Sequence, residues 1–292
     1  MSNQFTTNYL DEKYLQEFYQ SKEGFSWAYE TLSGYSEFAS IRKFELIMSL
    51  IKKMKPENIL DNGCGGGLFT RSLAKDGFSV VGFDLSLGLL LKIKSSLPAV
   101  TPEQGEKLSL IAGNSQRLSF KNNSFSLCLC SEVLEHIPDC EKTIEELSRV
   151  LEEDGKAIIT VPNLHCYDSL EGRFKIISKI LEVINFGRRL LGKEEIYRYG
   201  YNTHLHKYTP FQWRKILEKN GLKVTFEHPV FISPYIPQVI KPLKWVERFL
   251  YSKDLIFRLQ NFVENYLSLV YPFKFLGQLH LFICEKRSLL DE

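Results

Sequence analysis

The sequence predicts an α/β fold with a doubly wound, mostly parallel sheet, helices on both faces and an antiparallel last strand at one edge. Two observations predict it. Apolar runs of strand length alternate with helical segments between residues 56 and 162, which is the rhythm of parallel strands joined by crossover helices. A glycine cluster follows the first strand and opens a helix, an arrangement that lets the backbone approach a ligand closely.

The N-terminal part and the core supply the first elements. Residues 9–55 are expected to be largely helical, with an apolar stripe at helical spacing that Pro56 ends. The core is expected to hold strands at 57–62, 79–84, 108–112, 125–130 and 156–161, and helices at 68–76, 86–96 and 140–152. Gly155 predicts a glycine stop for the last of these helices.

Beyond Pro162 the alternation is interrupted twice and resumes in between. A helix with Thr209 as its cap and Pro210 at its first position is expected, followed by two strands. These three elements are expected at 210–220, 222–227 and 278–286. We therefore expect a single domain over 1–292. It would consist of an N-terminal helical cap at 1–55, a cofactor-binding core at 56–162, and two helical insertions at 163–208 and 234–275.

Charge is unevenly distributed although the formal net charge is only +2. Residues 1–162 carry 17 Lys and Arg against 22 Asp and Glu, whereas residues 163–288 carry 20 against 11. An acidic half and a basic half suggest two different roles. No continuous Lys/Arg stripe or known motif for nucleic acid is present, so a nucleic-acid partner is not expected.

Cysteine use and the N-terminus bear on the cellular compartment. Six cysteines in 292 residues do not make a disulfide framework, and Cys128 and Cys130, two apart on a strand, are expected to share an apolar face. The polar N-terminus lacks a secretory signal pattern, and no apolar run reaches the roughly 18 residues of a membrane span. We expect a cytoplasmic protein, with peripheral membrane contact left open.

The glycine cluster carries most of the functional signal. Ile59 and Leu60 belong to a buried strand, Asp61 follows, and four glycines stand between positions 63 and 67. The next strand ends in Asp84, where an acid about 20 residues beyond the loop can accept hydrogen bonds from ribose hydroxyls. A dinucleotide motif requires a small residue at position 68, where Leu68 disfavours an oxidoreductase.

Two motifs together resemble a known family. The spacing of Asp61, Gly63, Gly65 and Gly67 resembles the first motif of the class I S-adenosylmethionine-dependent methyltransferases, and Val-Leu-Glu-His-Ile-Pro at 133–138 is similar to the segment after their fourth strand. The likeness covers about residues 39–230, and within the family the chain resembles the methyltransferase type 11 and ubiquinone-biosynthesis O-methyltransferase-like group. It implies a Rossmann-like fold and S-adenosyl-L-methionine as the cofactor. The cofactor-binding residues that it implies are Asp61, Gly63, Cys64, Gly65, Gly67, Asp84, Leu85, Asn114, Ser115, Ser131 and Glu132.

Three histidines are candidates for catalysis: His136, His165 and His204. His136 follows the fourth strand and could take the proton of a hydroxyl acceptor, since an imidazole has an ordinary pKa of about 6.5. Alternatively, it only closes the cofactor pocket. His204 and His206 would share a face if extended, but a third ligand is missing, so no metal site is expected.

The resemblance implies methyl transfer to a small-molecule or lipid-like acceptor, at oxygen. The alternatives are a dinucleotide-dependent oxidoreductase and a non-catalytic adaptor at a membrane surface. The two insertions would form a lid on the acceptor side. Within the first insertion, residues 173–198 combine basic residues with apolar residues at helical spacing, so they either cover the acceptor pocket or rest on an anionic membrane.

Overall fold

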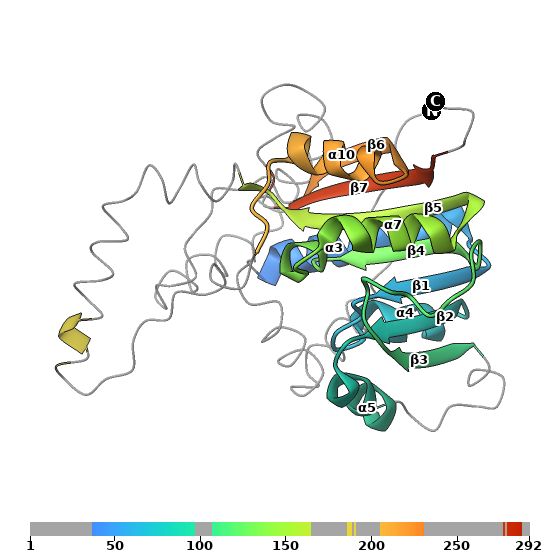
Figure 1. Cartoon of the computed structure of the whole chain (residues 1–292). Coiled ribbons are helices and arrows are strands. Elements are labelled where there is room, and N and C mark those ends of the chain that lie inside the picture. The colour runs from blue at the N-terminus through green and yellow to red at the C-terminus, as the bar shows by residue number, and fades with distance from the viewer. Residues whose placement is uncertain are drawn as a thin grey trace, which may run out of the picture.

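The computed structural model describes residues 37–96, 107–164, 186–188, 190, 205–230, 277 and 279–287. Their centre is one seven-stranded sheet with the order β3-β2-β1-β4-β5-β7-β6 (Figure 1). Its strands are β1 (Asn58–Asn62), β2 (Ser79–Asp84), β3 (Leu108–Ala112), β4 (Phe125–Ser131), β5 (Leu151–Pro162), β6 (Leu222–Val230) and β7 (Leu279–Lys286). The predicted Rossmann-like, doubly wound architecture is confirmed.

The first five strands pair in parallel, and β7 pairs antiparallel with both β5 and β6. The antiparallel last strand is therefore confirmed, but its predicted position at the edge is wrong, because β7 lies inside the sheet and β6 forms the edge. Burial explains the difference. Residues 279–284 of β7 are all buried, as suits an interior strand, whereas β6 alternates buried with exposed positions.

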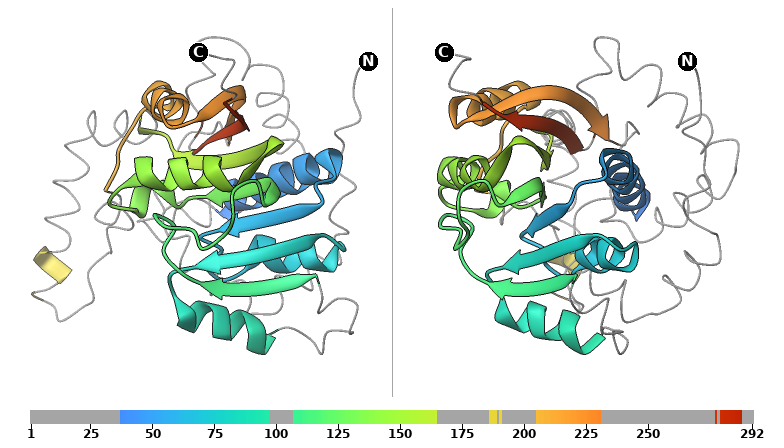
Figure 2. Two further views of the ribbon diagram at one scale, coloured as in Figure 1. Left: turned by 45° about the vertical axis from the view of Figure 1, so that its right-hand side comes forward. Right: turned by 90° about the vertical axis from the view of Figure 1, so that its right-hand side faces the viewer.

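Helices cover both faces of the sheet (Figure 2). On one face α3 (Glu37–Met54) and α4 (Leu68–Lys75) pack on the strands, and on the other face α7 (Cys140–Val150) and α10 (Pro210–Lys219) do so. The helix α5 (Leu87–Ser96) packs beside β2 and β3. Each face has its own apolar core, and Cys128 and Cys130 belong to the same one, as predicted.

The junction between α7 and β5 differs from the sequence prediction. The helix was expected to reach residue 152 and to stop at Gly155, but it ends at Val150, and Leu151 is already extended, with φ −72° and ψ 137°. Leu151 is fully buried and pairs with Phe125 of β4. A Cβ on Gly155 would lie 2.9 Å from the Leu151 side chain. Gly155 therefore makes room for a buried leucine and does not terminate the helix.

Both α7 and α10 begin with a side-chain cap, and for α10 this confirms the predicted roles of Thr209 and Pro210. The Asp139 side chain accepts a hydrogen bond from the Lys142 N–H at the start of α7. At the start of α10, Thr209 and Gln212 form a reciprocal capping box with Pro210 at the first position. Such caps satisfy backbone N–H groups that have no partner within the helix.

Several predicted segments fall outside the described residues. Of the predicted helical stretch at 9–55, only residues 37–55 are described. Most of the insertion at 163–208 and all of that at 234–275 lie outside the described residues. Of the basic segment at 173–198, residues 186–188 and 190 are described, and all four are helical. Within the described part of the chain, none of the helices combines the length and the apolar character needed to cross a membrane.

Candidate functional site

The glycine loop lies at the carboxyl edge of the sheet, between β1 and α4. Gly63, Gly65 and Gly67 all have positive φ, of 72°, 51° and 75°. A Cβ on Gly63 would lie 2.4 Å from the Val133 side chain, and one on Gly67 would lie 2.7 Å from the Ile93 side chain. These two glycines therefore allow both a left-handed backbone and close packing against the segments after β4 and in α5.

Gly65 has a different environment, because a Cβ there would meet no atom within 4 Å. Its N–H donates a hydrogen bond to one carboxylate oxygen of Asp84, at 2.8 Å, and the other oxygen accepts from the Ser86 N–H, also at 2.8 Å. The structure thus joins the glycine loop to the acid at the end of β2. We call the open space beside Gly65, next to the loop backbone and the Asp84 carboxylate, the cradle.

Asp61 is buried behind the glycine loop, with 3% of its surface exposed. Its carboxylate accepts a hydrogen bond from the Thr70 hydroxyl at 2.5 Å. Burial raises the pKa of Asp61 to about 6, against the lowering effect of Thr70. Thr70, at the third position of α4, was not predicted as a site residue.

Cys64 packs inward from the loop. Its side chain is buried with Leu90 and Ile93, and burial raises the pKa of the thiol. The N–H groups of Gly63 and Cys64 both donate to the Phe83 carbonyl, which ties the loop to β2. Cys64 can therefore border a ligand through its backbone, whereas its buried sulfur stabilises the loop.

A buried polar link joins the ends of three strands. The Asn62 side-chain oxygen accepts a hydrogen bond from Ser115 at 2.8 Å, and its amide nitrogen donates to the Cys130 sulfur at 3.6 Å. Asn114 is exposed, and its side-chain oxygen accepts from the Gln116 N–H at 2.9 Å. Ser115 and Asn114 thus lie on one turn after β3, with Ser115 facing inward. Asn62 was not predicted, although a polar residue ending a buried strand was visible in the sequence.

The segment after β4 closes the other side of the cradle. The Ser131 and Thr160 hydroxyls are 2.9 Å apart, and the Glu132 N–H donates to the Thr160 carbonyl. Glu132 has a φ of 58°, a backbone conformation that is uncommon without glycine. Leu85, directly after Asp84, is 77% exposed and lies at the same edge.

Two glutamates of this segment have carboxyl groups that are buried without hydrogen bonds. Both side-chain oxygens of Glu132 and of Glu135 lack a hydrogen-bond partner among the described residues. Glu135 belongs to a short 3-10 turn, η1 (Leu134–His136), and is fully buried. Burial raises its pKa well above the ordinary range, and the neighbouring charge of Glu132 adds to this, whereas Lys43 of α3 opposes it. Sequence reasoning assigned only the backbone of Glu132 and did not single out the Glu135 side chain.

His136 ends η1 and is the catalytic candidate that the structure describes. Its side chain is 43% exposed, and its Nε2 lies 3.8 Å from Oε1 of Glu135. His165 and His204 lie outside the described residues. The turn η1 therefore presents an accessible imidazole next to the buried carboxyl group of Glu135.

The chain before α10 packs against η1. The Leu205 N–H donates to the Glu135 carbonyl at 2.7 Å, and the His206 Nε2 lies 2.8 Å from the Ile137 carbonyl oxygen. The His206 ring stacks on Tyr208, with ring centroids 5.6 Å apart. His206 therefore holds this segment in place and was only weakly distinguished in the sequence.

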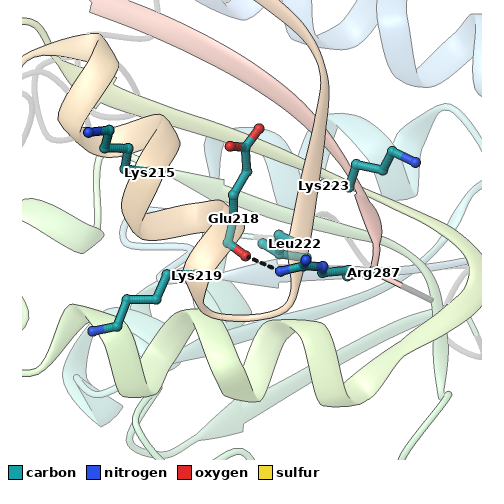
Figure 3. A pocket seen from close by; sticks show the side chains of 6 residues that line it. All are labelled: Lys215, Glu218, Lys219, Leu222, Lys223 and Arg287. Atoms are coloured by element: carbon teal, nitrogen blue, oxygen red, sulfur yellow. Dashed lines mark hydrogen bonds between the residues drawn. The ribbon is translucent and has the colours of Figure 1, made fainter. Parts of the chain in front are cut away.

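A hollow of about 480 Å³ lies elsewhere, where α10 ends and β6 begins (Figure 3). Its lining is mostly basic and consists of Lys215, Glu218, Lys219, Leu222, Lys223 and Arg287. Arg287 donates to the Glu218 carbonyl at 3.4 Å across it. Because β6 runs parallel to β1, the start of β6 is at the amino edge, away from the cradle. This hollow is therefore separate from the glycine-loop site.

Known proteins are similar to the part of the chain that contains these residues. A family model described as a methyltransferase domain matches residues 35–226. The chain is 32% identical to the uncharacterized protein MJ0638 of Methanocaldococcus jannaschii over 78% of this chain and 84% of that protein. It is 30% identical to a ubiquinone biosynthesis O-methyltransferase of Coxiella burnetii over 38% of this chain, but spans only 45% of that relative.

One solved structure supports the fold independently. The crystal structure of the PH0226 protein from Pyrococcus horikoshii OT3 superposes with a TM-score of 0.51 and covers 86% of this chain and 92% of its own. Sequence identity between the two is 17%, so the similarity concerns the fold alone. The glycine loop, Asp84 and the segment after β4 all lie within residues 35–226, the range that the family model matches.

Proposed function

We propose that this chain, which belongs to the class I S-adenosylmethionine-dependent methyltransferases, transfers a methyl group to an oxygen of a small-molecule or lipid-like acceptor. The family makes it an enzyme and makes S-adenosyl-L-methionine its cofactor. This replaces the oxidoreductase and the non-catalytic adaptor that the sequence had left open.

The residues of the cradle fit this cofactor. The open space at Gly65 leaves room that a Cβ would fill, and the carboxylate of Asp84 is fixed by two backbone N–H groups. Asp84 would accept hydrogen bonds from the ribose hydroxyls, and the loop from Gly63 to Gly67 would border the amino-acid part. Asn114 would offer its side-chain oxygen to the adenine amine, because an amide oxygen has two lone pairs.

When bound, the cofactor supplies an activated methyl group. The protein's task is then to align the acceptor and to receive its proton, because most of the activation is already present in the sulfonium. The half-exposed imidazole of His136, at the end of η1 in the segment after β4, carries this part of the proposal. In its neutral form it can accept the proton of an acceptor hydroxyl.

The choice of oxygen has a separate support. The Coxiella burnetii relative is named as a ubiquinone biosynthesis O-methyltransferase, and it aligns over 110 residues. That name states an oxygen acceptor for the relative. For this chain it favours a hydroxyl acceptor, and an apolar one agrees with the exposed side chains of Phe186 and Leu190 in the first insertion.

A turnover screen tests the proposal. Phenols and aliphatic alcohols are incubated with S-adenosyl-L-methionine and the protein, and methylated products are identified by mass spectrometry. With a turned-over hydroxyl acceptor, His136→Ala should lower kcat by ~10²–10⁴ while cofactor affinity is unchanged. The matched control is His206→Gln, whose amide can still donate to the Ile137 carbonyl and which should keep the wild-type rate. Methylation confined to amines or thiols would contradict the oxygen assignment.

A further inference from the structure

The buried carboxyl groups of Glu132 and Glu135 have no role in the description so far. All four of their oxygens are buried and lack a hydrogen-bond partner among the described residues. Folded proteins rarely leave such groups unsatisfied, since a buried acceptor without a donor is costly. Two such carboxyl groups, three residues apart in the sequence, therefore indicate a partner that the described residues do not supply.

Their position is at the cradle. Val133, between the two glutamates, contacts Gly63 so closely that a Cβ on Gly63 would lie 2.4 Å from it. Asp61 precedes Asn62 at the end of β1, and the Asn62 amide donates to the Cys130 sulfur at 3.6 Å near the end of β4. Asp61, Glu132 and Glu135 therefore all lie near the ends of these two strands, and their charges also act on the buried Cys130 thiol, whose pKa is raised mainly by burial.

Within the described part of the chain, few positive charges oppose these acids. Lys43 of α3 is 2% exposed and its charge acts on Glu135, and the His136 Nε2 lies 3.8 Å from Oε1 of Glu135. Lys43 therefore balances one negative charge at most. If every acid ionises, the buried region is left with excess negative charge, which is unfavourable in a region of low dielectric constant. A positively charged ligand would remove this excess.

The two forms of the cofactor differ in this respect. S-adenosylmethionine carries a positive sulfonium, whereas S-adenosylhomocysteine, the demethylated product, has a neutral thioether in its place. Their adenosine and amino-acid parts are the same. Any difference between the two in proton binding therefore reports on groups that respond to the sulfonium charge.

We propose that Glu135 senses the charge of the cofactor: it holds a proton when the neutral product is bound and releases it when S-adenosylmethionine binds. Glu132 supplies the neighbouring negative charge that keeps the proton on Glu135, and Lys43 limits that effect. The inference rests on the family's cofactor and not on the proposed acceptor.

Proton and charge balance across the reaction agree with this role. As the S–CH₃ bond breaks, its electron pair stays on sulfur, which becomes neutral, and a hydroxyl acceptor loses one proton as its O–CH₃ bond forms. Glu135 gains one proton in the same interval, whether directly or through His136. The buried region therefore keeps the same net charge before and after methyl transfer, and the proton leaves when fresh cofactor replaces product.

Calorimetry without any acceptor tests the proposal. The full chain is titrated with each ligand at pH 7 in phosphate and in Tris, whose ionisation enthalpies differ, so that protons released on binding can be counted. We expect S-adenosylmethionine to release up to about one proton more than S-adenosylhomocysteine. The ratio of the two affinities should also rise with pH, by up to about tenfold per pH unit where Glu135 titrates.

Three variants make the test specific. Glu135→Gln should abolish the difference in proton release and flatten the affinity ratio. Glu132→Gln removes the neighbouring charge, so the same difference should appear at lower pH, and this variant keeps the test decisive if Glu135→Gln fails to fold. Glu145→Gln, an exposed acid of α7 paired with Lys142, is the matched control and should behave as wild type.

The outcomes separate cleanly. Equal proton release for both ligands in the wild type, or a difference that survives in Glu135→Gln, would overturn the proposal. Binding of neither ligand would overturn the cofactor assignment together with the proposal. A failed acceptor screen leaves these measurements intact, so the proposed function and this inference can be refuted independently.

Discussion

Ionisation of the buried Asp61 carboxyl group lowers the stability of the fold. Burial raises its pKa from 3.8 to about 6, so the native protein binds this proton more tightly than the unfolded chain does. Stability is therefore greatest below pH 4 with respect to this group, and it falls as pH rises towards 6, by about 3 kcal/mol in total.

The first prediction concerns this pH dependence. Asp61→Asn keeps an oxygen that can accept from Thr70 but cannot ionise, so the fall in stability between pH 4 and 6 should be reduced by about 3 kcal/mol. Urea unfolding of the cofactor-free protein at a series of pH values measures it. An identical pH profile in Asp61→Asn would assign the effect to other groups.

The second prediction concerns Asp84. Its carboxylate is held by the N–H groups of Gly65 and Ser86, which position it for ribose hydroxyls. Asp84→Ala should lose about 1.5–3 kcal/mol of cofactor binding, which is roughly a 10- to 150-fold rise in Kd. Calorimetry with S-adenosylhomocysteine measures this. Asp76→Ala, at the far end of α4, is the control and should bind normally; unchanged affinity in Asp84→Ala would contradict the assignment.

Single residues differ in how far the sequence predicts them. The approach of Gly65 to Asp84 follows from the sequence, because Gly65 follows β1, Asp84 ends β2, and adjacent parallel strands end at the same edge. The link from Asn62 to Ser115 and Cys130 does not. Its partners stand 53 and 68 residues away, so their approach depends on packing that no local pattern encodes.

At the scale of elements, the glycine loop separates two roles, and this gives the third prediction. Gly63→Ala would force a Cβ into the Val133 side chain, so it should destabilise the protein in thermal unfolding. Gly65→Ala meets open space and should cost about 1–2 kcal/mol for its left-handed backbone, yet it should abolish cofactor binding because the new methyl group enters the cradle.

The control for this pair is Gly187→Ala, a position that also has open space around an added Cβ but lies outside the loop. It should bind cofactor normally. A stable Gly65→Ala protein with wild-type affinity would show that the cofactor does not approach this part of the loop.

The extent of an element is predicted well where local chemistry sets it. Thr209 and Pro210 mark the start of α10 in the sequence, because capping acts within one helical turn. The predicted end of α7 was wrong because two signals compete there. Gly155 is a usual helix stop, but burial of Leu151 against β4 favours an extended chain four residues earlier. Tertiary packing decided the boundary.

At the scale of the whole molecule, the uneven charge leads to the fourth prediction. Residues 163–288 carry a net +9, from 20 Lys and Arg against 11 Asp and Glu. The chain should therefore bind anionic liposomes at low salt and release them at high salt, since screening shortens the reach of surface charges. Liposome flotation measures this, with zwitterionic vesicles as the control.

Replacing Arg188 and Arg189 together by Glu would locate the contact, because both lie in the basic segment at 173–198. We expect the double variant to lose most of the binding. Absence of wild-type binding at low salt would refute the membrane contact and favour a lid over the acceptor pocket. Binding that survives the double substitution would move the contact to residues 234–275.

The place of β7 between β5 and β6 has a consequence for how the protein is made. Within the described sheet, β6 pairs only with β7, and β7 is translated after it, beyond residues 231–278. On the ribosome, β1 to β5 can assemble as a nascent sheet, whereas β6 cannot pair until β7 has been made. Docking of β7 between β5 and β6 is a long-range closure and therefore a slow one. Until it occurs, the edge of β5 can pair with incorrect strands, so the need for chaperones should be greatest between the synthesis of β5 and the docking of β7.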